Sequence, residues 1–100
     1  MAFQSTQKNQ LNVIKCPAYI DGIECKQLEV LMNSWLKLDI KAHLFDFKET
    51  QNIEKIAYRI FTQFKKDLQA KERKLISFNL KPNLLEKLNK DGIDSVFGPV

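Results

Sequence analysis

The fold is decided by the stretch Ala42-His43-Leu44-Phe45-Asp46-Phe47 and by the segment that follows it. This run is mostly apolar and predicts a buried β-strand. A polar turn over residues 48–52 leads into an amphipathic helix. At about 100° per residue its apolar side chains fit an arc of roughly 140°: Ile53, Ile56, Ala57, Ile60, Phe61, Phe64 and Leu68. Because the strand is apolar on both faces, we expect cover on both sides of it, one side from this helix.

The residues before this stretch predict two strands and a helix. Strands are expected over residues 2–6 and 11–16, with a turn at 7–10 between them, and Pro17 ends the second strand. A further turn over residues 19–22 contains Asp21, which suits the N-cap of a helix over residues 23–36. That helix has apolar residues at helical spacing: Leu28, Leu31, Met32, Trp35 and Leu36.

The residues after the stretch predict another strand, a helix and a final strand. A charge-rich exit over residues 65–74 leads to a strand at 75–80. Pro82 suits the first turn of a helix and Gly92 its C-terminal cap. Residues 93–97 complete the chain as a short strand or extended segment. The order ββαβαβαβ predicts one α/β domain over residues 1–100, built on a parallel or mixed sheet with helix cover.

Composition excludes several classes of protein. The formal charge of +4 comes from sixteen basic and twelve acidic residues, which indicates a mixed-sign surface rather than a dedicated polyanion binder. Two cysteines and one histidine cannot form a four-ligand zinc site by themselves. Residues 1–10 lack the apolar core of a signal peptide, and no run reaches the length of a membrane span. We therefore expect a cytoplasmic protein with reduced thiols.

No catalytic motif is present in the sequence. With three glycines, the chain has no GxGxxG, no GxxxxGK[ST] and no GxSxG motif. Cys16 or Cys25 could be paired with His43, but His43 falls in the apolar strand and the cysteines suit buried, small apolar positions. No pair of carboxylates can be identified as candidates for general acid–base catalysis. The sequence therefore predicts no enzyme, no metal site and no cofactor.

Several local patterns, taken in order, resemble the STAS domain, the module of bacterial anti-sigma factor antagonists and of sulfate-transporter tails. They are Ala18-Tyr19-Ile20-Asp21 followed by Leu28, the strand Leu44-Phe45-Asp46-Phe47, the helix with Pro82, Leu85 and Leu88, and Gly92-Ile93-Asp94-Ser95-Val96-Phe97. The resemblance covers residues 11–100. It implies a four-to-five-stranded mixed sheet with helices mainly on one face.

The chain departs from the family at the motif that carries its phosphorylation switch. Phosphorylatable members open the second helix with Asp-Ser-Ser/Thr-Gly, where this chain has Glu54-Lys55-Ile56-Ala57. The acid is kept, but neither central residue has a hydroxyl, so the usual phosphate cannot be added there. Three hydroxyl side chains lie nearby and are interpreted as ordinary surface groups: Thr50, Tyr58 and Thr62.

The start of this helix remains a candidate partner-binding site. Asn52 is a candidate cap, and Glu54 either stabilises the first turn or offers a permanent acidic contact. Four residues are placed on the exposed side of the helix, where they could extend such a contact: Lys55, Tyr58, Arg59 and Thr62. The candidate partner-binding residues are these four together with Asp21, Asn52 and Glu54.

Two classes of function follow from the resemblance. The first is a non-enzymatic interaction module that binds a GHKL-type kinase or anti-sigma factor, or another STAS protein, without phospho-switching; a homodimer is left open. The second is an accessory STAS subunit of a lipid or anion transport system, or a nucleotide- or lipid-binding module. Nucleic-acid binding ranks third, because Asp67 and Glu72 interrupt the basic run over residues 65–74.

Overall fold

The structure is a computed structural model that describes residues 2–97. Met1 and residues 98–100, which belong to the expected domain, lie outside the described residues. The elements follow one another as β1 (Gln4–Lys8), β2 (Leu11–Lys15), β3 (Tyr19–Ile20), α1 (Gly22–Trp35), β4 (Ala42–Asp46), β5 (Asn52–Ile53), α2 (Lys55–Ala70), β6 (Lys74–Phe78), α3 (Pro82–Lys90) and α4 (Asp94–Phe97).

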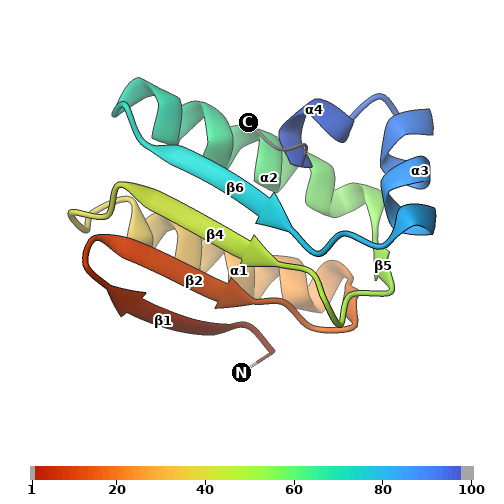
Figure 1. The fold of residues 1–100 in the computed structure, drawn as a ribbon, viewed down its shortest axis with the longest axis horizontal. Helices are drawn as coiled ribbons and strands as arrows, with labels where there is room; N and C mark the ends of the chain where they lie inside the picture. The colour runs from red at the N-terminus through yellow and green to blue at the C-terminus, as the bar shows by residue number, and fades with distance from the viewer. Residues whose placement is uncertain (1, 98–100) are drawn as a thin grey trace.

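A mixed four-stranded sheet forms the front layer of the molecule in Figure 1, with α1 and α2 behind it. The strand order is β1-β2-β4-β6; β1 pairs antiparallel with β2, and the remaining pairs are parallel. The expected mixed sheet with helices mainly on one face is confirmed. The register places Val13, Leu44 and Ile76 beside one another across the three parallel strands.

The hairpin between β1 and β2 is tighter than the sequence pattern indicates. The first strand runs to Lys8, so the turn shrinks to two residues, Asn9 at φ 52° and Gln10 at φ 66°. Two positive φ angles in a two-residue loop match the right-handed twist of the paired strands. Asparagine tolerates this conformation better than most residues, which makes Asn9 the local signal for the turn.

One face of the sheet carries the aromatic core. Phe45 of β4 and Phe47, which directly follows this strand, are fully buried. Phe45 packs edge-on against Phe61 and Phe64 of α2, with ring centroids 5.2 and 6.2 Å apart. Trp35 of α1 lies 6.3 Å from Phe45. The expectation of cover on both sides of β4 is wrong. Ala42, Leu44 and Asp46 remain partly exposed on the other face, because both long helices pack on the aromatic side.

The alternation in β2 is opposite to the apolar pattern of its sequence. Leu11 and Val13 are 43 % and 39 % exposed, whereas Asn12 and Ile14 face the core and are fully buried. A one-residue shift exchanges the two faces of a strand. The pairing of Ile14 with Phe45 across the parallel ladder fixes this register.

The final strand predicted over residues 93–97 is a single helical turn, α4. Val96 and Phe97 are both buried, and the Phe97 ring lies 4.7 Å from the Phe61 ring. Adjacent residues of a strand point to opposite faces, whereas a helical turn can direct both toward one core. The order ββαβαβαβ is therefore wrong at its last element.

Two short predicted segments also differ. Tyr19–Ile20 and Asn52–Ile53 form a separate parallel pair, β3 with β5, in place of a turn and of the start of the second helix. Ile20 and Ile53 are partners in this pair and both are fully buried. The pair holds the two chain segments that lead into α1 and α2.

Candidate functional site

The first turns of α1 and α2 begin side by side. The β3–β5 pair aligns the residues that precede them, and the Glu54 N–H donates to the Ile20 carbonyl oxygen at 3.0 Å. Asp21 follows Ile20 and Glu54 follows Ile53, so both helices start with an acidic residue at the same edge of the molecule.

The start of α1 is capped by its own side chain, as predicted. One carboxylate oxygen of Asp21 accepts the N–H groups of Ile23 and Glu24 at 3.1 and 3.2 Å. Its backbone carbonyl also accepts the Cys25 N–H at 2.8 Å. These bonds satisfy donors that the first turn of a helix otherwise leaves free.

The start of α2 has no such cap. Glu54 occupies the N-cap position in extended conformation, its side chain makes no capping bond, and the residue is exposed. The expectation that Asn52 caps this helix is wrong. Asn52 belongs to β5, and its amide oxygen accepts a bond from Lys87 Nζ of α3 at 2.6 Å. The carboxylate of Glu54 is therefore not used for capping.

An apolar hollow lies between the two first turns. Ile23 is 71 % exposed and Ile56 is 54 % exposed, although both are large apolar side chains. They line one open hollow of about 650 Å³ together with Asp21, Gly22, Lys26 and Gln27. The hollow has an apolar wall from each helix and polar groups along the α1 side, an arrangement that suits an apolar side chain of another molecule.

The buried arc of α2 is rotated relative to the predicted one. Ile56 leaves the core and Tyr58, which was expected on the exposed side, enters it with 9 % exposure. Tyr58 Oη donates to a carboxylate oxygen of Asp91 at 2.7 Å, where α3 ends. Burial, this hydrogen bond and the charge of Asp91 raise the pKa of Tyr58. The C-terminal helices thus draw the Tyr58 side of α2 inward.

The hydroxyl groups near the degenerate motif all donate hydrogen bonds within the chain. Thr50 is fully buried, and its hydroxyl donates to the Pro17 carbonyl at 2.9 Å. Thr62 is half-buried and donates to the Tyr58 carbonyl at 2.7 Å. The interpretation of Thr50 and Tyr58 as surface groups is therefore wrong. Of the other predicted site residues, Lys55 and Arg59 are exposed on α2.

The cysteines and the histidine lie in the core. Burial, and then the charge of Asp46, raises the pKa of the Cys16 thiol; burial, followed by the charges of Asp21, Glu24, Glu29 and Glu54, raises that of Cys25. Both thiols are free. His43 is fully buried, and its Nδ1 lies 3.1 Å from Nδ2 of Asn12. Burial, with a smaller contribution from Arg73, lowers the pKa of His43 to about 4. These shifts disfavour thiolate and imidazolium at neutral pH.

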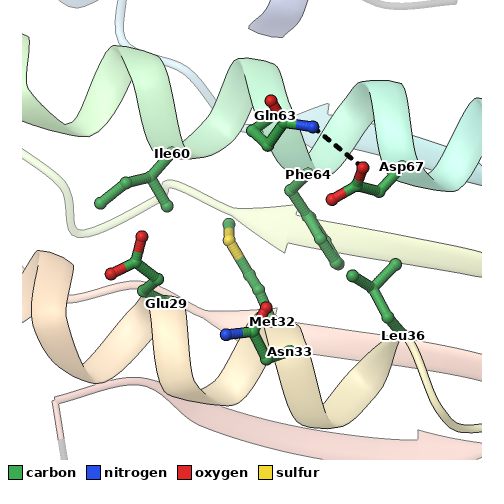
Figure 2. A pocket seen from close by; sticks show the side chains of 8 residues that line it. All are labelled: Glu29, Met32, Asn33, Leu36, Ile60, Gln63, Phe64 and Asp67. Carbon is green, nitrogen blue, oxygen red and sulfur yellow. Dashed lines mark hydrogen bonds between the residues drawn. The ribbon is translucent and has the colours of Figure 1, made fainter.

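A second hollow lies between the bodies of α1 and α2 (Figure 2). It measures about 60 Å³, with Met32 and Phe64 on its floor. Gln63 Nε2 donates to Asp67 at 2.9 Å on its α2 side. The volume is far below that of typical ligand pockets. Within residues 2–97 there is no cluster of three metal-ligating side chains, and no helix there is long and apolar enough to cross a membrane.

The sequence did not predict Ile23 as a site residue, and it placed Ile56 in the degenerate motif and in the buried arc but not on the partner-binding surface. Ile56 lay at the edge of the apolar arc, roughly 40° from its nearest neighbour in that arc, which was the available signal. Ile23 carried no signal of its own, since a single isoleucine at a helix start suits a core position equally well.

Comparison with known proteins assigns the chain to a family. No curated protein matches the sequence. The solved structure of the anti-sigma factor antagonist SpoIIAA in its unphosphorylated form is similar, with a TM-score of 0.83 at 14 % identity over 99 % of this chain and 88 % of that one.

Two further anti-sigma factor antagonists share the fold. A STAS domain protein from Planctomyces limnophilus has a TM-score of 0.78 at 17 % identity, covering 95 % of this chain and 86 % of its own. An antagonist from Mycobacterium paratuberculosis has a TM-score of 0.76 at 14 % identity, covering 95 % and 80 %. A family model for the STAS domain matches residues 2–100. The chain therefore belongs to the STAS domain family.

Proposed function

We propose that the chain is a single STAS domain that acts in the cytoplasm as a non-enzymatic protein-interaction module of bacterial signalling. It resembles an anti-sigma factor antagonist, and its proposed partner is a GHKL-type kinase or anti-sigma factor, or another STAS protein. The observation that carries the proposal is the exposure of Ile23 and Ile56 on two adjacent helix starts. Two large apolar side chains in one hollow favour an interface anchor over a solvated surface.

The proposed contact is not switched by phosphate at the family's usual position. Residues 54–57 contain no hydroxyl. The nearby hydroxyls of Thr50, Tyr58 and Thr62 donate to groups of the same chain, so they are poor substitutes. Glu54 keeps an acidic side chain at the start of α2, two residues before Ile56. The interaction would therefore be set by the concentration of the partner rather than by a kinase acting on this helix.

The charges around the hollow indicate the chemistry of the partner. Asp21 and Lys26 line the hollow on the α1 side, Glu54 starts the neighbouring helix, and Lys55 is exposed beside it. An apolar side chain entering the hollow, with a basic group beside it, would meet both carboxylates. Rim charges of this kind steer association and register more than they add affinity.

The test is affinity capture from the native cell with the purified chain as bait, followed by mass spectrometry. The bait is compared with an Ile23→Ser/Ile56→Ser variant and with Val30→Ser, whose side chain is 70 % exposed on α1 and does not line the hollow. We expect one signalling protein to be retained by the chain and by Val30→Ser but lost from the double variant. Equal retention by all three baits would rule out the proposed surface.

A transport-accessory or small-ligand role is the second candidate. The hollow between the helix starts falls within the volume range of ligand sites, and each helix gives it one apolar wall. Titration with nucleotides and with short-chain lipids distinguishes the two roles. A saturable response confined to residues of this hollow favours the ligand role, and no response favours the protein-interaction role.

A further inference from the structure

The face of the sheet opposite the helices carries a second apolar surface, distinct from the hollow between the helix starts. Twelve strand positions point to this side according to the register of the ladders. Six of them are apolar, and three of those stand in one row across the parallel strands. The six, here called the open-face stripe, are Leu11, Val13, Ala42, Leu44, Ile76 and Phe78.

The open-face stripe runs diagonally across the sheet. It begins at Leu11 and Ala42, widens at the row of Val13, Leu44 and Ile76, and ends at Phe78. With strands about 4.8 Å apart and residues about 3.3 Å apart, the diagonal is roughly 16 Å long. That length equals about three turns of an α-helix.

Lysines stand on both sides of the diagonal. Lys15 occupies the corner of β2 beyond Val13, and Lys74 occupies the opposite corner, on β6 beside Ala42. Lys8 of β1 lies beyond the Leu11 end. The single acidic side chain among the twelve positions is Asp46, and one of its oxygens already accepts bonds from the Lys48 N–H and from Asn79 Nδ2. The margins of the stripe are therefore basic.

These lysines are available to a partner. Lys15 contacts Glu49 at 3.4 Å, but both side chains are more than half exposed, and exposed pairs of this kind are weak and exchange readily. Lys8 and Lys74 are exposed and make no salt bridge within the described residues.

The size of the surface selects a helix over a second copy of the chain. Four strands of five residues present roughly 300 Å² of flat area, whereas a stable dimer buries about 800 Å² on each partner. A second copy would also bring its own lysines against Lys8, Lys15 and Lys74. A flat sheet has few protruding side chains to insert into a bilayer, since Leu44, Ile76 and Phe78 are already half-buried.

We infer that the open-face stripe is a docking surface for an amphipathic helix of a partner protein, with an apolar ridge and acidic residues along both margins. The helix lies along the diagonal, its ridge on Val13, Leu44 and Ile76 and its carboxylates beside Lys15 and Lys74. The same sheet already accepts two helices on its other face, so helix-on-sheet packing suits its twist.

The experiment uses a designed probe, a stapled three-turn helical peptide with a leucine ridge and glutamates on both margins. A second peptide has lysines in place of the glutamates. Both are titrated into the ¹⁵N-labelled chain. We expect saturable amide shifts confined to β2, β4 and β6, with the glutamate peptide binding roughly tenfold more tightly than the lysine peptide. No saturable shift on these strands, or equal affinity for the two peptides, would overturn the inference.

Charge reversal supplies the matched control. Lys15→Glu/Lys74→Glu is expected to invert the preference between the two peptides, whereas Lys26→Glu/Lys55→Glu, at the helix starts, leaves it unchanged. Failure of Lys15→Glu/Lys74→Glu to alter the preference contradicts the inference. Two other outcomes would also contradict the inference. If the wild-type chain forms a dimer that Val13→Glu dissociates, the face binds a second copy. If the chain binds phosphatidylglycerol vesicles and this binding requires Lys15 and Lys74, the face binds a membrane.

Discussion

The starts of α1 and α2 lie next to each other and are stabilised in different ways. The first turn of α1 is held locally, because Asp21 accepts two backbone N–H groups of the turn. The first turn of α2 is held from a distance, since Glu54 makes no capping bond while Tyr58 reaches Asp91 and Phe61 packs on Phe97. A helix start that depends on tertiary packing leaves its acidic residue available for another molecule.

The largest effect is expected from removing the tertiary support of α2. Phe61 is fully buried, with ring contacts to Phe45, Phe47 and Phe97. Phe61→Ala should lower the free energy of unfolding by about 3–5 kcal/mol, measured by urea denaturation. Amide hydrogen exchange should accelerate in the first turn of α2 more than in that of α1. Equal acceleration in both turns would remove the distinction between them.

Acid should weaken both helices together. His43 lies 6.0 Å from the Trp35 ring of α1 and 5.2 Å from the Phe64 ring of α2. Its pKa is about 4 in the folded chain and 6.5 when unfolded, so the unfolded state binds the proton more readily between these values. Stability should therefore fall by about 2–3 kcal/mol from pH 7 to pH 4.5.

The control for this prediction is His43→Gln, which should be less stable at neutral pH but should lose this part of the pH dependence. Urea unfolding at pH 7 and at pH 4.5 gives the stability of each chain and its change with pH. If the free energy of unfolding of His43→Gln falls between pH 7 and pH 4.5 as much as that of the wild type, the acid sensitivity comes from other groups.

The two N-cap residues, Asp21 and Glu54, should contribute unequally to the free energy of unfolding, and both contributions should be smaller than the effects above. Asp21→Ala should cost about 1 kcal/mol, because the carboxylate satisfies two N–H groups, and Asp21→Asn should restore most of it. Glu54→Ala should change the free energy of unfolding by about 0.5 kcal/mol or less. Equal losses for both alanine variants in thermal unfolding would show that Glu54 is also a structural cap.

The smallest effect should come from the exposed isoleucines. Ile56→Ser and Ile23→Ser should each change the free energy of unfolding by about 0.5 kcal/mol or less, since both side chains are more than half exposed. Ile60→Ser, at a buried position one turn further along α2, is the matched control and should cost several times more. If Ile56→Ser lowers the free energy of unfolding by more than about 1.5 kcal/mol, Ile56 is a core residue and not part of an exposed site.

The sequence predicted elements whose pattern is local. The strand predicted at residues 42–47, the helix that follows and the cap at Asp21 are visible in hydrophobic spacing and in single residues. All three are confirmed, although the strand ends at Asp46 and the helix begins at Lys55. The order of motifs also indicated the STAS family, which residues 2–100 match.

What the sequence did not predict depends on distant partners. The rotation of α2 that buries Tyr58 follows from α3, where Asp91 lies 33 residues away. The helical turn at Asp94–Phe97 follows from the site that Phe61 offers to Phe97. The outward turn of Leu11 and Val13 follows from the register with β4. In each case the local sequence pattern is compatible with two conformations or orientations, and packing against distant residues decides which one forms.

Site-specific photo-crosslinking in the native cell shows whether a partner contacts the paired helix starts. A benzophenone amino acid replaces Ile56 in one variant and Val30 in the other, both at exposed positions. We predict a discrete crosslink from position 56 to one signalling protein, a GHKL-type kinase, an anti-sigma factor or another STAS protein, and none from position 30. No crosslink from position 56, or the same products from both positions, would contradict the claim that the paired helix starts form the partner site.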